Sequence, residues 1–118
     1  MKYLCLVYRE EKQLDAMSGS EFAAFVAEHQ VYREALRKSG HGIAAEGLQP
    51  VRTATTVRMR NGKVTTTDGP FAETKEQLGG FFLIDAGDLD EAIRVASKIP
   101  AARLGSIEIR PIRESEPR

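Results

Sequence analysis

A chain of 118 residues, 42% of them hydrophobic, is long enough for one domain with a single core. Its 17 basic and 17 acidic residues give a formal net charge of zero, which argues against direct binding to nucleic acid or to an anionic membrane. The lone cysteine excludes an internal disulfide, and no apolar segment approaches the roughly 18 residues of a membrane span. Without a signal-peptide pattern, we expect a cytoplasmic protein with one domain over residues 1–118, ending in a short tail after about residue 112.

The first half of the chain predicts a strand, a long helix and a second strand. Residues 2–8 are rich in β-forming residues and apolar on both faces, as in a buried strand. A helix is predicted from a capping box of Ser18 and Glu21 to a stop at Gly40. A short strand is expected within residues 43–50. The inward stripe of the helix has helical spacing and comprises Phe22, Phe25, Val26, His29, Tyr32 and Leu36.

The second half predicts a hairpin, a buried strand, a helix and a last strand. Segments TATTVRMR and KVTTT flank Asn61-Gly62, the strongest two-residue hairpin signal. Residues 79–86 are again apolar on both faces, and residues 88–100 predict a second helix that ends at Pro100. Residues 105–112 alternate in polarity, which is typical of an edge strand. The expected buried stripe of the second helix comprises Leu89, Ala92, Ile93, Ala96 and Ile99.

This order of elements predicts an α+β fold, a ferredoxin-like βαββαβ sheet with an extra β-hairpin. In such a split βαβ sheet the first and third frame strands are central. Right-handed crossovers place the two helices on one face of the sheet. Because the central strands are apolar on both faces, the other face needs a cover. Either a second copy of the chain covers it, giving a homodimer, or the hairpin folds back over it.

The motif DGPFAETKE at residues 68–76, followed by GGFFLID and the late IEIRPI, resembles the DGPF-domain branch of the YCII-related family. The resemblance extends from residue 2 to about residue 112. It implies a ferredoxin-like α+β fold and a dimeric α/β barrel, and it supplies no substrate. Some members of this branch occur with extracytoplasmic-function sigma factors, so the resemblance also implies a possible sigma-factor partner in transcription regulation.

The signature motif offers charged candidates for a functional site. Asp68, at the head of a turn, is expected either to accept hydrogen bonds from backbone amides downstream or to act as an acid. Phe71 is expected to be a hydrophobic plug. Glu73 and Lys75 belong either to the lining of a pocket or to a solvated run of charges.

His29 is the second candidate because it lies on the apolar stripe of the first helix. It is either a core histidine satisfied by a hydrogen bond or a proton-transfer group. In YCII relatives outside this branch, a histidine on this helix is paired with an acid whose position falls here at Lys38. Asp68, Glu46 or Glu73 would have to replace that acid. Burial would lower the pKa of His29 and a carboxylate would raise it; we expect the lowered value.

Two functional classes remain open. The first is a small-ligand enzyme or binding protein with a polar pocket beside the signature, in which His29 and Asp68 are catalytic. Its ligand-binding residues would be Glu46, Glu73, Lys75 and Arg110. Arg110 either meets an anionic group or is a surface partner for a carboxylate. The second class is a non-catalytic interaction module that serves a regulator such as a sigma factor.

No metal or organic cofactor is implied. The two histidines and the one cysteine are widely spaced and match no metal-site pattern. The chain contains no G-x-S-x-G elbow, phosphate-binding loop or dinucleotide fingerprint. Cys5, on a central strand, is expected to be buried and inert, and His41 to be exposed.

Overall fold

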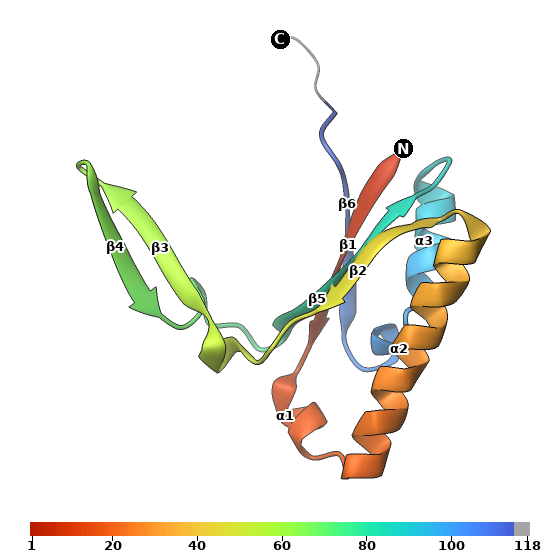
Figure 1. Cartoon of the computed structure of the whole chain (residues 1–118), viewed down its shortest axis with the longest axis horizontal. Helices are drawn as coiled ribbons and strands as arrows, with labels where there is room; N and C mark the ends of the chain where they lie inside the picture. Colours follow the sequence, from red (N-terminus) through yellow and green to blue (C-terminus); the bar gives the residue numbers. More distant parts are fainter. Residues whose placement is uncertain (115–118) are drawn as a thin grey trace.

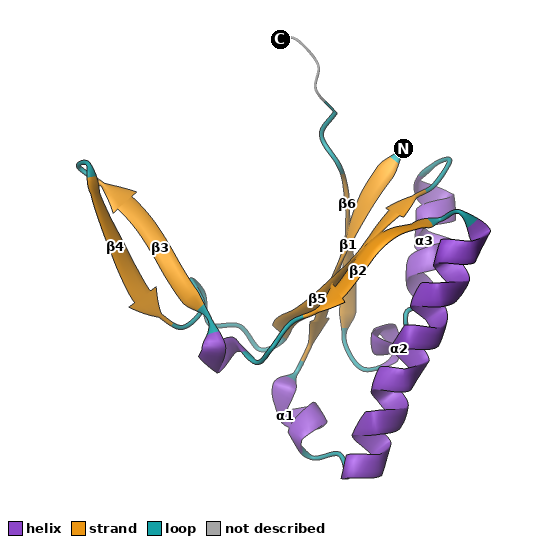
Figure 2. Cartoon of the chain, viewed as in Figure 1, coloured by secondary structure: helices purple, strands orange, loops and turns teal. Residues whose placement is uncertain are grey.

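The computed structural model describes residues 1–114, which form a four-stranded antiparallel sheet, helices and a separate hairpin (Figures 1 and 2). The predicted tail lies, from residue 115 on, outside these residues. The elements in chain order are β1 (Lys2–Arg9), α1 (Glu11–Asp15), α2 (Gly19–Ser39), β2 (Gly42–Gly47), β3 (Thr55–Arg60), β4 (Lys63–Asp68), β5 (Gln77–Asp85), α3 (Leu89–Ser97) and β6 (Ser106–Pro111). Short 3-10 helices lie at Val51–Thr53 and Pro100–Arg103.

The strand order in the main sheet is β2-β5-β1-β6, so the two strands predicted to be central are central. On β1, Cys5 lies opposite Phe82 of β5 on one side and Ile109 of β6 on the other. Helices α2 and α3 cover the same face of this sheet (Figure 2). The α+β frame and its strand order therefore agree with the prediction from the sequence.

The core lies between this covered face and the helices. Alternate residues of β1 point into it, and Tyr3, Cys5 and Val7 are buried there. Burial raises the pKa of the Cys5 thiol to about 11, as expected for an inert cysteine. Leu36 of α2 and Ile99, which follows α3, complete the apolar contact.

Helix α2 begins and ends where the sequence predicts. The Ser18 side chain accepts a hydrogen bond from the Glu21 amide, and the Glu21 side chain accepts one from the Ser18 amide. At the other end Gly40 adopts φ 85°, a left-handed conformation that favours glycine. The short helix α1 was not predicted; it continues β1 directly and precedes the capping box.

The predicted stripe of α3 was right at three positions and wrong at two. Leu89 and Ile93, expected in the core, are exposed, and the buried residues are Ala92, Val95, Ala96 and Ile99. Ala92, Ala96 and Ile99 belong to both the predicted and the observed stripe, and periodicity alone did not decide between Val95 and the pair Leu89 and Ile93. The alanines let a short helix lie close to the sheet, which turns the larger side chains outward.

Strands β3 and β4 form a two-stranded arm, residues 55–68, that is a sheet of its own. Its turn is the predicted one, with Asn61 at φ 52° and Gly62 at φ 74°. The arm projects away on the side of the main sheet opposite to α2, so the hairpin does not fold back over the uncovered face (Figure 1).

That uncovered face, called here the open face, carries Leu4, Leu6, Phe81 and Leu83. These residues alternate with the buried ones on the two central strands and are half-buried. Within residues 1–114, no helix has both the length and the apolar character needed to cross a membrane.

Candidate functional site

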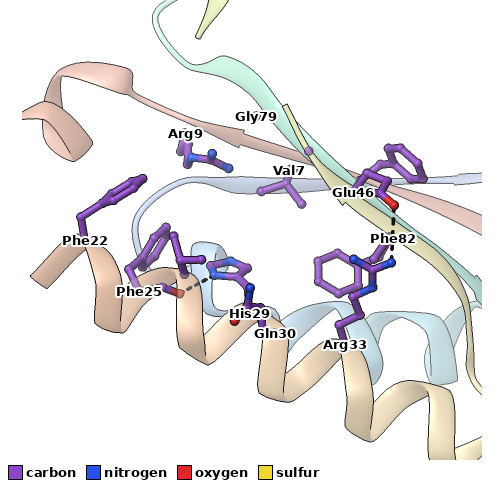
Figure 3. A pocket seen from close by; sticks show the side chains of 15 residues that line it. Val7, Arg9, Phe22, Phe25, His29, Gln30, Arg33, Glu46, Gly79 and Phe82 are labelled. Carbon is purple, nitrogen blue, oxygen red and sulfur yellow. Dashed lines mark hydrogen bonds and ion pairs between the residues drawn. The ribbon is translucent and has the colours of Figure 1, made fainter. Parts of the chain in front are cut away.

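A cavity of ≈ 220 Å³ lies between the N-terminal half of α2 and the strands β1, β2 and β5 (Figure 3). Two residues of the predicted inward stripe of α2, Phe22 and Val26, line this cavity and are 45% and 38% exposed. Phe25 and His29 line it at greater depth. The predicted stripe therefore faces a pocket at this end of the helix, not a packed core.

Glycines on the strands create the space opposite these side chains. Gly47, Gly79 and Gly80 line the pocket from β2 and β5. A Cβ atom on Gly80 would lie 2.8 Å from the Glu46 carbonyl oxygen, so β2 and β5 approach closely because this residue has no side chain. The pairing of β1 with β5 shifts register beside Val7, which leaves Gly79 in a β-bulge of the kind often found next to binding sites.

His29 is held by backbone groups through both ring nitrogens. Nδ1 lies 2.8 Å from the Phe25 carbonyl oxygen, and the Ala101 amide donates to Nε2 over 3.2 Å. These contacts assign a neutral ring that is protonated on Nδ1. Burial lowers the pKa of His29 below 6.5; the bond to Phe25 opposes this shift and the charge of Arg9 adds to it. The direction is the one expected for a core histidine.

Arg9, the last residue of β1, lines the pocket and forms no ion pair with another residue of the range 1–114. Its Nε atom is buried and makes no hydrogen bond within residues 1–114. A Cβ atom on Gly79 would lie 2.5 Å from the Arg9 Cζ, so the guanidinium lies over the backbone of Gly79. Burial lowers the pKa of Arg9, and the charge of Glu11 opposes the shift.

Glu46 is the one sequence-predicted ligand-binding residue that lines the pocket together with His29. Its carboxylate accepts a hydrogen bond from Arg33 of α2 over 3.4 Å, and both side chains are largely exposed. Among the described residues that line the pocket, Glu46 is the single carboxylate. Its negative charge is balanced by the positive charge of Arg33.

The signature residues Asp68, Glu73 and Lys75 do not line this pocket. All three are exposed, at the base of the arm or in the segment between β4 and β5. The turn is held by backbone groups of Gly69, whose amide donates to Ala54 over 2.7 Å and whose carbonyl accepts from Thr56. The hydrogen bonds expected for the Asp68 carboxylate are absent from the part of the chain that the structure describes. The assignment of Asp68 to catalysis stays a prediction.

The end of the signature has structural contacts that the sequence did not reveal. The Gln77 side chain donates to the carbonyl oxygen of Thr74 and accepts from the Glu11 amide, over 2.7 and 2.9 Å. Glu76 accepts from the Ser106 hydroxyl at the start of β6. Phe71, expected to be a plug, is 82% exposed in this single chain.

The remaining candidates lie elsewhere. Arg110 is exposed on β6, opposite Leu4, with its Nε 3.8 Å from the Glu108 carboxylate. His41 is half-buried, contrary to expectation, because its Nε2 lies 2.7 Å from Glu91. No group of three or more residues able to ligate a metal occurs within residues 1–114.

Sequence reasoning missed two charged residues of the pocket, Arg33 on α2 and Arg9 on β1. The signal for Arg9 was the alternation of side chains along a strand. Arg9 is the next odd-numbered position after Tyr3, Cys5 and Val7, so it falls on the helix-facing side of β1. A charge at such a position, with a pair of glycines on the neighbouring strand, marks a break in the core. The sequence does not show that Gly79 lies beside Arg9, because this follows from the pairing of β1 with β5.

Together the fold and the pocket define a small α+β protein with a ligand-sized space between one helix and its sheet. The sequence model of the YCII-related domain matches residues 1–116, and the chain belongs to the YCII-related family. An uncharacterised protein of Rhizobium meliloti (strain 1021) is 37% identical over 114 residues, which are 95% of this chain and 92% of that protein.

A solved structure is similar in fold. It is the 5-chloro-2-hydroxyhydroquinone dehydrochlorinase from Burkholderia phenoliruptrix AC1100, in complex with 2,5-dihydroxybenzoquinone. The match has a TM-score of 0.57 and covers 98% of this chain and 96% of that one, at 15% sequence identity. At this identity the likeness shows a common fold.

Proposed function

We propose that this protein binds a small organic molecule in the pocket between α2 and the sheet. One observation carries the proposal: at the N-terminal end of α2, the apolar side chains of Phe22 and Val26 face a cavity of ≈ 220 Å³ instead of packed side chains of the sheet. Apolar side chains beside an empty space forgo contacts that a ligand would supply. For scale, an apolar cavity of about 150 Å³ holds benzene.

The comparison of folds supports the proposal. The dehydrochlorinase of similar fold is an enzyme whose structure holds a small ring compound. A fold of this kind is therefore compatible with a site for such molecules. The identity of the molecule must come from the residues of this chain, because function depends on the site and not on the fold.

Binding is better supported than proton transfer. A general acid or base needs a ring nitrogen or carboxylate free to reach the substrate. Both nitrogens of His29 are bonded to backbone groups, and Asp68 lies at the base of the arm. A catalytic pair of these two residues stays a prediction that requires another chain to bring Asp68 to the pocket.

A fragment screen by protein-observed NMR tests the binding function. Ring compounds that bind should shift the amide resonances of Val26 and Gly80, and Val26→Trp should abolish binding by filling the space. Val31→Trp is the matched control, because Val31 lies on α2 with 71% exposure and does not line the pocket. Binding that survives in Val26→Trp, or shifts confined to other surfaces, would refute the pocket as the site.

We further propose that the protein is a homodimer in which a second copy covers the open face. Leu4, Leu6, Phe81 and Leu83 form a contiguous apolar surface in the centre of the sheet, and such surfaces mark interfaces. Sedimentation equilibrium should give twice the chain mass of 13.0 kDa. Leu6→Glu should reduce it to the single mass, whereas Ile93→Glu on α3 should not. A wild-type protein that sediments as one chain at micromolar concentration would rule out the dimer.

The arm favours the second candidate function, an interaction module for a regulator such as a sigma factor. Val57, Met59 and Val64 share one face of the arm and are all exposed. An isolated two-stranded hairpin is marginally stable in water, so its apolar side favours a protein partner. Calorimetric titration with a purified extracytoplasmic-function sigma factor tests this function. Binding that Met59→Asp abolishes would support it, and the absence of heat would count against it.

A further inference from the structure

The pocket contains one cation with a partner and one without. Arg33 is hydrogen-bonded to Glu46, whereas Arg9 forms no ion pair within residues 1–114. Buried polar atoms are normally bonded, and a buried charged donor left unpaired is costly. The buried Nε of Arg9 is the polar side-chain atom of the described chain that breaks this rule. Because Nε is shielded, an acceptor from outside the chain would balance the charge of Arg9 through the terminal nitrogens of the guanidinium.

The surroundings of Arg9 keep its guanidinium at the pocket. It lies over Gly79, whose missing side chain leaves the room that the guanidinium occupies. The amide of Leu48 donates to the Gly79 carbonyl oxygen over 2.9 Å, which fixes this piece of backbone under the arginine. Figure 3 shows Arg9 on the sheet side of the space and Phe22 and Phe25 on the helix side.

We infer that the pocket takes a small carboxylic acid with an apolar body, whose carboxylate binds Arg9. The inference rests on the proposed ligand-binding function and names the class of ligand. Nε itself is shielded by the protein, but the two terminal nitrogens of the guanidinium form a planar fork that matches the two oxygens of a carboxylate. The body of the acid lies against Phe22, Phe25 and Val26, which are apolar and on the opposite wall.

The charges around the site agree with an anionic ligand. Arg9 and Arg33 are the cations among the described lining residues, against the single carboxylate of Glu46. His29 is neutral in its bonded form and adds no charge. Glu11 acts on Arg9 at a distance, but its carboxylate accepts a hydrogen bond from the Val51 amide. The pocket therefore holds one positive charge in excess.

The test uses benzoate and its neutral isostere benzamide as probes, titrated into the wild-type protein by NMR. Both fit a space of this size, and they differ in the group that would meet Arg9. We expect benzoate to bind more tightly than benzamide and to shift the Arg9 Nε–H resonance. Arg9→Gln should weaken benzoate about tenfold, the effect of losing a charge-assisted hydrogen bond, and leave benzamide unchanged.

Two further variants separate the position of the guanidinium from the charge of the protein. Gly79→Ala keeps every charge but places a Cβ where the guanidinium lies, so it should weaken benzoate as Arg9→Gln does. Arg103→Gln removes a charge outside the pocket, from an exposed arginine paired with Glu28, and should bind benzoate as the wild type does. The wild-type comparison of the two probes stands even if a variant fails to fold.

The outcomes distinguish this inference from the proposed function. If benzamide and benzoate bind equally and Arg9→Gln affects neither, the carboxylate inference is wrong while the pocket still binds ligands. If phenyl phosphate binds more tightly than benzoate at Arg9, the assignment to a carboxylate is overturned. If no ring compound, charged or neutral, perturbs the pocket resonances, the proposed function itself fails.

Discussion

The contact between α2 and the sheet differs at its two ends. At the C-terminal end Leu36 is buried, and Tyr32 lies beside Phe82 with ring centroids 6.2 Å apart. The Tyr32 hydroxyl also donates a hydrogen bond to the Val95 carbonyl oxygen. At the N-terminal end Phe22 and Val26 belong to the same helical stripe but remain exposed.

The difference comes from the strands. Opposite the C-terminal end of α2, called here the closed end, β5 presents Phe82 and Ile84. Opposite the N-terminal end of α2, called here the open end, it presents Gly79 and Gly80. The same apolar periodicity of a helix thus yields a core where the facing strand presents large side chains and a pocket where it presents a pair of glycines. The pocket arises here because the strand lacks side chains at these two positions, without a change in the pattern of the helix.

The largest expected effect is at the closed end. Leu36→Ala should lower the free energy of unfolding by about 2–4 kcal/mol, because it leaves a cavity in a packed interface. Phe22→Ala, at the open end, should cost less than about 1 kcal/mol although it removes more atoms, because the ring already borders a cavity and solvent. Urea unfolding of the two variants gives both values. Equal decreases in the free energy of unfolding for the two variants would show that the two ends of α2 are packed equally well.

His29 lies between the two ends of α2, and its substitution should have an intermediate, pH-dependent effect on the free energy of unfolding. His29→Gln should lower the free energy of unfolding by about 1–3 kcal/mol at neutral pH, because two backbone groups lose their partner. The folded pKa of His29 lies below the unfolded value of 6.5, so its contribution is complete above 6.5 and decreases as the pH falls below it. The difference in the free energy of unfolding between the wild type and His29→Gln should therefore decrease as the pH is lowered. A gap that widens would show a raised pKa and an acidic partner.

Chemical access should differ between the ends in the same way. Cys5 is fully buried under the helices and its thiol pKa is about 11, so iodoacetamide should not modify it in the folded protein. A thiol placed at the open end by Val26→Cys should react in minutes to hours, measured by mass spectrometry. Modification of Cys5 at a similar rate would show that the closed end opens readily.

The smallest effect is expected away from both ends. Asp68→Ala should change the free energy of unfolding by no more than about 0.5 kcal/mol, because its carboxylate is exposed and the turn is held by the backbone of Gly69. Thermal unfolding measures this. A loss above about 1 kcal/mol would reveal a contact of Asp68 in an assembly of chains.

Local signals predicted most of the frame. The capping box at Ser18, the stop at Gly40 and the Asn61-Gly62 turn each depend on a few neighbouring residues, and all three were confirmed. The strand order followed from two runs that are apolar on both faces, since only central strands need such runs. The stripe of α3 was predicted wrongly only at Leu89 and Ile93, because periodicity alone did not show that Val95 is buried and these two are exposed.

The sequence by itself determined the two longer helices, the strands, which strands are central and that one sheet face lacks a cover. These properties depend on periodicity and on contacts between neighbours along the chain. Only the tertiary structure decided that the N-terminal half of α2 faces a pocket and that Arg9 lies over Gly79. The physical reason is that these two residues are 70 positions apart, and their contact depends on the register of β1 against β5, including its bulge. A one-residue change in that register would place a side chain where the cavity now lies.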